Sequence, residues 1–179
     1  DDISMTKKGK SGFNITGIYP YDIKKSRMPS ISLSSNFSNF PLSIINQYFP
    51  KFFDINGDAT GTVTISGNPK KSNYSYQIEV ENMIFDLVEL GKVSLEGSYK
   101  DNSLFIEKLF SKSINGEIIV TGYIPYNLNI GSSNLGKYFS DDTFDLSIHS
   151  KLNNLYLLTP YITDLDSIIG DFDVILELT

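Results

Sequence analysis

Apolar and polar residues alternate with a period of two along most of this chain. The clearest run is 74–80, where tyrosine, isoleucine and valine occupy every second position and serine, glutamine and glutamate fill the positions between. The same alternation recurs over 92–99, 104–107, 144–149 and 173–178. Successive side chains of a β-strand point to opposite faces, so this pattern is typical of half-buried antiparallel strands with one apolar and one polar face.

The apolar positions of these strands form a candidate binding surface, because they share one face of the predicted sheet. They are Val63, Ile65, Tyr74, Tyr76, Ile78, Val80, Val93, Leu95, Leu104, Ile106, Ile118, Val120, Phe144, Leu146, Ile148, Val174 and Leu176. Two interpretations fit such a set: an ordinary core that a second layer covers, or an apolar face left open to a ligand. Phe85, Phe105 and Phe172 allow the same two interpretations.

Turn residues separate the alternating runs. The Asn-Gly pair at 115–116 is the strongest short signal for a β-hairpin, and Asp-Asn at 101–102 and Lys-Gly-Lys at 8–10 mark two more. Gly-Asn-Pro at 67–69 ends the strand expected over 58–66. Consecutive strands joined by such short turns predict an antiparallel sheet.

Two stretches, 41–49 and 160–168, break the alternation and carry apolar residues at helical spacing. These residues are Leu42, Ile45 and Tyr48 in the first stretch and Tyr161, Leu165 and Ile168 in the second. A proline opens each stretch, and Thr159 is a suitable N-cap for the second. We expect two short helices, which either cover one end of the sheet as part of its core or plug the space over its apolar face.

One segment of the sequence repeats after 105 residues. Residues 17–23 (GIYPYDI) return as 122–128 (GYIPYNL), and a Gly-Asp pair follows each copy, at 57–58 and at 170–171. A long repeat built from alternating strands is the signature of a stacked β architecture. In such an array the function lies in a continuous surface rather than in a cluster of catalytic residues.

The repeat divides the expected single β segment 1–179 into units. Residues 1–27 end one unit, 28–128 form a full unit and 129–179 begin the next. The loop 127–136 is rich in Asn, Ser and Gly, and its length makes it the expected seam between units. We therefore expect an internal section of a longer array.

Composition excludes several classes of function. The formal net charge is −6 and there is no basic stripe, which argues against binding of nucleic acid. The chain has no cysteine, and the alternation places its single histidine, His149, on the polar face. These residues offer no nucleophile–base pair and no set of metal ligands, so we expect neither an enzyme nor a cofactor site. No apolar run approaches the ~20 residues of a membrane helix.

The order of these motifs resembles the repeats of the AsmA-like and TamB-like (translocation and assembly module) proteins of the bacterial envelope. Gly-Asp at 57–58 is followed by GTVTISGNP at 61–69, the long alternating run, GSYKDNSL at 97–104 and INGEIIVTGYIP at 114–125. The resemblance covers residues 55–128 directly. It extends to the flanking residues because the internal repeat relates them to this segment. Each motif is ordinary turn chemistry, and their order carries the resemblance.

The resemblance implies a mainly β fold, a curled antiparallel sheet (a β-taco, or repeating β-groove) with one or two short helices. The apolar face would then line a groove for lipid acyl chains. The parent protein would be anchored to the bacterial inner membrane, and this section would lie in the periplasm. The implied function is passive conduction of phospholipid between the inner and outer membranes, which supports outer-membrane biogenesis. The implied partner of the full-length protein is an outer-membrane barrel-assembly protein of the TamA or BamA type.

Two other functions fit the same strands. An open sheet edge can pair with the strands of a client, as in a chaperone-like scaffold that assembles outer-membrane β-barrel proteins by β-augmentation. A carbohydrate-binding or adhesive β-sandwich would need aromatic residues on the polar face, where only Phe105 and Tyr123 fall. Open edges also predict that the segment self-associates end to end.

Overall fold

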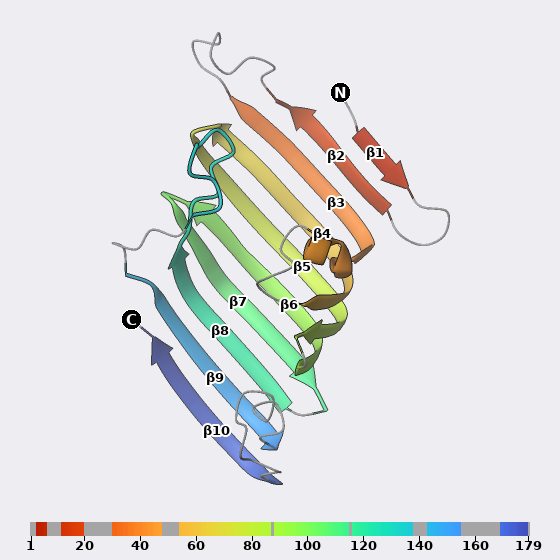
Figure 1. The fold of residues 1–179 in the computed structure, drawn as a ribbon, viewed down its shortest axis with the longest axis vertical. Coiled ribbons are helices and arrows are strands. Elements are labelled where there is room, and N and C mark those ends of the chain that lie inside the picture. Colours follow the sequence, from red (N-terminus) through yellow and green to blue (C-terminus); the bar gives the residue numbers. More distant parts are fainter. Residues whose placement is uncertain are drawn as a thin grey trace.

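The computed structural model is an open sheet of ten antiparallel strands (Figure 1). The strands lie in the sheet in the order in which they occur in the chain, so each strand pairs with its sequence neighbours. The structure describes residues 3–6, 12–19, 30–47, 54–86, 88–114, 116–137, 143–154 and 169–178. The expected mainly β fold with a curled antiparallel sheet is confirmed.

The strands begin and end close to the predicted turns. They are β1 (Ile3–Thr6), β2 (Gly12–Ile18), β3 (Ile31–Pro41), β4 (Ile55–Asn68), β5 (Lys71–Phe85), β6 (Val88–Lys100), β7 (Ser103–Ser113), β8 (Gly116–Pro125), β9 (Asp145–Asn154) and β10 (Ile169–Leu178). Asp101 and Asn102 join β6 to β7 with φ values of 49° and 63°, as a type I′ hairpin requires. The other two predicted hairpins are present as the antiparallel pairs β1–β2 and β7–β8.

The helix expected over 41–49 is present as the 3-10 helix η1 (Leu42–Gln47) between β3 and β4. Leu42 and Ile45 lie in this helix. The predicted helix residues Tyr48, Tyr161, Leu165 and Ile168 fall outside the described residues. Within the part of the chain that the structure describes, no helix has the length and apolar character needed to cross a bilayer.

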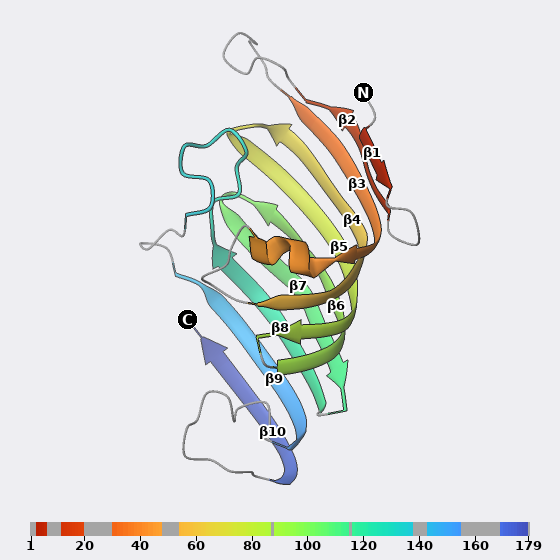
Figure 2. The same ribbon diagram turned by 45° about the vertical axis from the view of Figure 1, so that its right-hand side comes forward.

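The sheet is strongly curled and does not close into a barrel. Figure 2 shows β4, β5 and β6 bending around the side of the sheet on which η1 lies, while β1 and β10 remain at opposite ends. We call the side that carries η1 the concave face and the opposite side the convex face.

β-Bulges in the strands accompany this curl. The pairing register shifts between Phe37 and Phe40, Asn56 and Asp58, Val80 and Met83, and Ile106 and Leu109. A bulge leaves a residue unpaired, bends the strand and increases its twist. Asn39 and Asn82 lie in two of these bulges with φ values of 47° and 52°, a left-handed conformation that asparagine adopts more readily than β-branched residues do.

The buried core lies under η1. Leu42, Ala59, Val80 and Val93 form a cluster in which every residue is at most 8% exposed. Asn46 holds the helix above this cluster, because its side chain accepts a hydrogen bond from the Ile55 N–H and donates one to the Ile55 carbonyl, both at 3.0 Å. The helix is therefore a fixed cover over one part of the concave face.

Candidate functional site: the concave face

The structure brings the predicted apolar positions together on the concave face. Direct cross-strand partners point to the same side of a sheet, so the pairing register traces this face from strand to strand. One row of partners runs through Phe13, Phe37, Gly61, Ile78, Leu95, Leu109, Val120, Ile148 and Leu176. A second row runs through Ile15, Ser35, Val63, Tyr76, Gly97, Ile106, Gly122, Leu146 and Leu178.

Two outer rows flank these and contain most of the other predicted positions. On the side of η1 the row runs through Phe40, Ala59, Val80, Val93, Ser111, Ile118, Ser150 and Val174. On the other side it runs through Leu33, Ile65, Tyr74, Tyr99, Leu104 and Ile124. Phe144, which is half-buried, lies one residue before β9. The positions of Val174 and Leu176 are given by backbone register alone.

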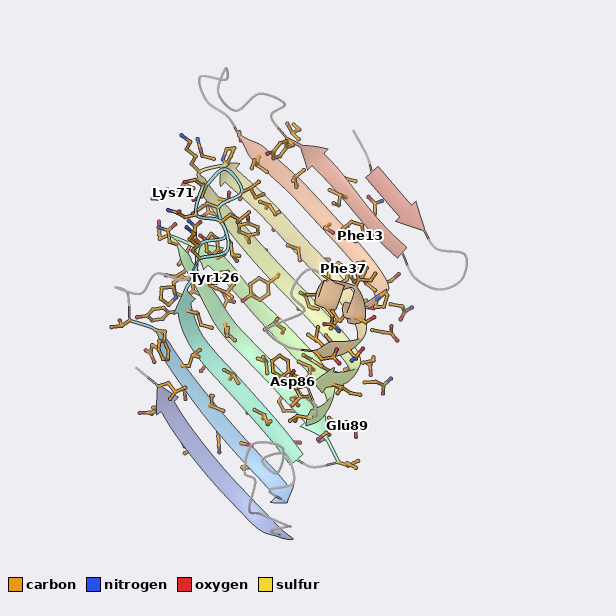
Figure 3. All side chains as sticks on the ribbon, in the orientation of Figure 1. Phe13, Phe37, Lys71, Asp86, Glu89 and Tyr126 are labelled. Atoms are coloured by element: carbon orange, nitrogen blue, oxygen red, sulfur yellow. The ribbon has the colours of Figure 1, made fainter. Side chains whose placement is uncertain are left out.

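Some concave residues were missed by the sequence analysis. The bulge in β7 puts both Ile106 and Leu109 on the concave face, so a strict period of two assigns Leu109 to the wrong side. Phe13 and Phe37 lie in strands rich in Ser and Asn, where the alternation is weak. Both rings lie within reach of Phe40, with centroid distances of 5.9 and 6.3 Å, and Figure 3 shows Phe13 and Phe37 on neighbouring strands.

Within the part of the chain that the structure describes, most of the concave face lies outside the buried core. Among the side chains that the structure describes, the buried hydrophobic residues are Ile31, Leu42, Ala59, Val80, Val93 and Tyr99. Val63, Ile78 and Leu95 are only half-buried, although they point away from the polar side of the sheet. In a β-sandwich a second sheet packs about 10 Å away and covers such residues. Within the described residues no second layer of this kind is present.

The loop 126–137 covers the concave face from the side opposite to η1. We call these residues the lip loop, because they follow β8 and lie against the ends of β4–β7, as Figures 1 and 3 show near Lys71 and Tyr126. Asn129 is 4% exposed, and its side chain accepts from Ser72 N–H at 2.7 Å and donates to Asn102 Oδ1 at 2.7 Å. The expected seam between units is thus packed onto the sheet.

Two tyrosines on the concave face form hydrogen bonds with the lip loop. Tyr99 is fully buried, and its hydroxyl oxygen accepts hydrogen bonds from Leu128 N–H at 3.0 Å and from Asn129 Nδ2 at 3.1 Å. Tyr74 donates to the Leu128 carbonyl, and its ring meets Tyr99 edge-on at 5.2 Å. Burial raises the pKa of both phenols, because the charged form loses its hydration. The concave face is therefore polar beneath the lip loop.

Tyr76 lies between the lip loop and η1 and crosses β6. Its hydroxyl donates a hydrogen bond to the Phe105 carbonyl on β7 at 2.7 Å. A Cβ atom on Gly97, the cross-strand partner of Tyr76, would overlap with the phenol. Burial, and then the nearby Glu107 carboxylate, raise the pKa of Tyr76 to about 12.

An uncharged strip remains between the two covers. We call it the apolar strip and define it by Val63, Ile78, Leu95, Ile106, Val120 and Ile148, one residue from each of β4–β9. All six are half-buried. The two central rows of partners contain no charged residue between β4 and β9. The strip is therefore a continuous apolar path that runs across the strands.

The convex face carries the charged residues and ion pairs of β5–β8, together with apolar residues such as Phe110 and Ile119. Lys92 lies 3.1 Å from Glu79 and 3.0 Å from Glu81, and both carboxylates raise its pKa. Lys112 pairs with Glu117 at 2.7 Å and lowers the pKa of that carboxyl. These groups are exposed, so their contribution to stability is small.

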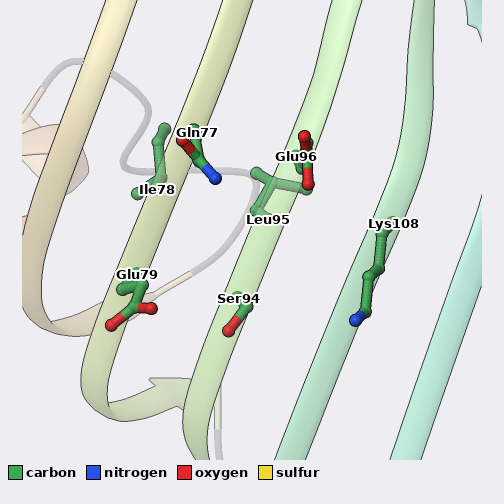
Figure 4. A pocket seen from close by; sticks show the side chains of 7 residues that line it. All are labelled: Gln77, Ile78, Glu79, Ser94, Leu95, Glu96 and Lys108. Atoms are coloured by element: carbon green, nitrogen blue, oxygen red, sulfur yellow. The ribbon is translucent and has the colours of Figure 1, made fainter.

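A shallow depression of about 200 Å³ lies over β5–β7 (Figure 4). Its lining is Gln77, Ile78, Glu79, Ser94, Leu95, Glu96 and Lys108. The pairing register places His149 on the convex side with Ile119 and Ile175, as the alternation predicted. Within the described residues, no three His, Asp or Glu side chains gather in a way that could hold a metal ion.

The geometry thus presents one extended feature, the apolar strip between η1 and the lip loop, rather than a compact pocket with reactive groups. Comparisons of the chain with family models, with curated proteins and with solved structures gave no match.

Proposed function

We propose that the apolar strip binds lipid acyl chains. The chain would be a section of a periplasmic groove that passively conducts phospholipid between the inner and outer membranes, as its resemblance to TamB-like repeats implies. The observation that carries this proposal is the strip itself: six half-buried apolar residues, one on each of six consecutive strands, without a charge between them. A contiguous apolar surface that remains accessible to solvent can mark a ligand-binding groove or an interaction site.

The dimensions of the strip suit an acyl chain. Neighbouring strands lie about 4.8 Å apart, so β4–β9 span about 24 Å across the strands. A bilayer has a hydrocarbon core of about 30 Å, so the chains of one leaflet reach about 15 Å. One acyl chain therefore fits along the strip with its head group outside, in water.

The same surface favours movement along the strip over tight binding. Each CH₂ group removed from water contributes about 0.8 kcal/mol, and this attraction has no preferred direction or position. Because the two central rows carry no charge, no residue there would hold a head group at one place. An acyl chain can then shift from strand to strand at little cost.

A crosslinking experiment with matched variants tests the proposal. A photoactivatable phospholipid should crosslink to the wild-type chain and to Gln77→Arg, whose side chain lies on the convex face. Ile78→Arg and Leu95→Arg place a guanidinium in the strip, so crosslinking should fall at least tenfold in both. If the two strip variants fold, by circular dichroism, and crosslink as well as Gln77→Arg does, the strip does not bind acyl chains.

The outer edges of the sheet favour a second candidate, the chaperone-like scaffold. β1 and β10 each have one side that pairs with no strand among the described residues. Free N–H and C=O groups on such an edge can pair with a strand of an unfolded outer-membrane protein. Co-purification separates the two candidates: bound lipid, detected by mass spectrometry, favours the groove, whereas edge crosslinks to a barrel protein favour the scaffold.

A further inference from the structure

The repeat in the sequence is also a repeat in the strand pairing. All seven residue pairs between β2 and β3 recur between β8 and β9, with the first partner shifted by 105 residues and the second by 113. Gly17 opposite Leu33 corresponds to Gly122 opposite Leu146, and Gly12 opposite Ser38 corresponds to Glu117 opposite Lys151.

The backbone at the repeated glycines is also the same. Gly17 and Gly122 have φ values of 135° and 134°. A Cβ atom on Gly17 would overlap with the Ser32 carbonyl oxygen, and a Cβ atom on Gly122 would overlap with that of Asp145. Ser32 and Asp145 are themselves 113 residues apart, so the two sites are equivalent in detail.

The equivalence extends to the strands on both sides. The four pairs between β1 and β2 recur between β7 and β8, from Ile3 opposite Ile15 to Leu109 opposite Val120. Five consecutive pairs between β3 and β4 recur between β9 and β10 with both partners shifted by 113 residues. The sheet therefore has a period of six strands, and β10 occupies the place of β4.

The six-strand period predicts which kind of strand would pair with β10. The far edge of β4 is paired along its length with β5, whereas the far edge of β10 pairs with no strand among the described residues. We propose that the β10 edge binds an antiparallel strand with the sequence pattern of β5, in the register that β5 has on β4. Shifting the β4–β5 pairs by 113 residues puts the equivalent of Gln77 opposite Ile175 and the equivalent of Ser75 opposite Glu177.

The alternation of side chains makes the β10 edge selective for a strand with the pattern of β5. The backbone of an edge strand can pair with any extended segment. The alternation of apolar and polar side chains decides in which register that segment binds, because its apolar residues must lie on the concave face. In the proposed register, the residues equivalent to Tyr76 and Ile78 continue the concave face, and those equivalent to Ser75 and Gln77 stay on the convex face. A slip of one residue would reverse both faces.

A second copy of this chain fits less well at the same edge. In the six-strand period β1 is equivalent to β7, which pairs with β6. Direct pairing of β10 with β1 of another copy would therefore omit two strands of the period, the equivalents of β5 and β6. Strand pairing at the β10 edge does not depend on what the apolar strip binds.

Crosslinking with a synthetic peptide of residues 71–85 tests the proposal. The chain has no cysteine, so single cysteines can be placed cleanly. Ile175→Cys, at a position 68% exposed, should react through a short thiol-specific crosslinker with a peptide carrying Gln77→Cys. Glu177→Cys should react with the Ser75→Cys peptide. Each matched pair should exceed the two mismatched pairs at least tenfold.

Two controls make the result decisive. A peptide with the same residues reordered to invert the alternation should not crosslink, and a peptide of β6 should lose to the β5 peptide in competition. Equal yields for matched and mismatched pairs, or no peptide crosslink to variants with wild-type circular dichroism, would overturn the proposal. So would crosslinking of Ile175→Cys to Ser4→Cys of a second copy in preference to the peptide. Lipid crosslinking to the strip, measured separately, shows whether the proposed function holds in either case.

Discussion

The phenol ring of Tyr76 occupies the space that a side chain on Gly97 would need. The two residues are direct partners on β5 and β6, and the Tyr76 hydroxyl reaches beyond Gly97 to the Phe105 carbonyl on β7 at 2.7 Å. Gly97 is therefore required by its neighbours and not by a left-handed backbone. The Tyr76 side chain thus links β5, β6 and β7 near the middle of the apolar strip.

Gly97→Ala should destabilise the protein by roughly 1–3 kcal/mol, the usual cost of forcing an extra methyl group into a packed site. The new Cβ would overlap with both the Tyr76 hydroxyl and the Phe105 carbonyl oxygen. Urea denaturation measures the loss. Ser98→Ala, on the convex face next to it, is the control and should change stability much less. Adding Tyr76→Ala should not rescue Gly97→Ala, because the overlap with the Phe105 backbone remains; full rescue would show that the ring is the sole obstacle.

Tyr76 should make stability fall at high pH. The pKa of this phenol is raised from 10.0 to about 12 in the folded protein, so the folded state keeps its proton where the unfolded state has lost it. The stabilisation is fully present below pH 10 and is lost as the pH rises from 10 to about 12. The difference in the free energy of unfolding between wild type and Tyr76→Phe should therefore shrink over this range.

Urea denaturation at several pH values gives this difference. Lysine residues also titrate at high pH, but they affect wild type and Tyr76→Phe alike and cancel in the comparison. A difference that stays constant from pH 10 to 12 would show that the phenol ionises alike in both states.

Asn129→Ala should detach the lip loop. The substitution leaves Ser72 N–H without its side-chain acceptor and removes the hydrogen bonds to Tyr99 and Asn102. A buried polar group left unpaired costs about 1–3 kcal/mol. Limited trypsin digestion should then cut faster after Lys137. Ser133→Ala, an exposed position in the same loop, is the matched control. Unchanged digestion of Asn129→Ala would mean that other contacts hold the loop.

Gly17→Ala and Gly122→Ala should destabilise the protein by similar amounts, roughly 1–3 kcal/mol each. Both glycines combine a φ near 135° with a close approach to the next strand, so alanine is excluded for the same two reasons. Gly12→Ala meets only the Ser38 hydroxyl at 3.3 Å and serves as the control. A large loss at one site with a neutral result at the other would contradict the equivalence of β2 and β8.

Much of the fold follows from local patterns in the sequence. The run 74–80 predicts a strand with one apolar face, and that strand is the middle of β5. Asp101-Asn102 predicts a hairpin because both residues tolerate the positive φ that a tight turn needs. Leu42 and Ile45 predict a helix, and both lie in η1. In each case the determining contacts lie within a few residues along the chain.

Other features depend on register and were missed. The phase of β7 changes at its bulge, which moves Leu109 onto the concave face. Phe105 comes before the bulge and lies on the convex face beside Tyr123, as the alternation predicted, with ring centroids 5.8 Å apart. The sequence predicted the loop around Asn129 only as a seam between units. Its packing against the ends of four strands was not predicted.

The sequence by itself determined that this protein has strands with an apolar face, short turns and a repeated unit. Alternation, turn chemistry and repetition are properties of neighbouring residues, so they can be read along the chain. The curl of the sheet was implied by the resemblance to known repeats and not by any local pattern. Only the tertiary structure decided that η1 and the lip loop cover two sides of the concave face, and that an uncharged strip lies between them. Those outcomes rest on contacts such as Asn129 with Ser72, which lie 57 residues apart. Such contacts depend on how the bulges set the register of every strand between them, and no local pattern encodes that.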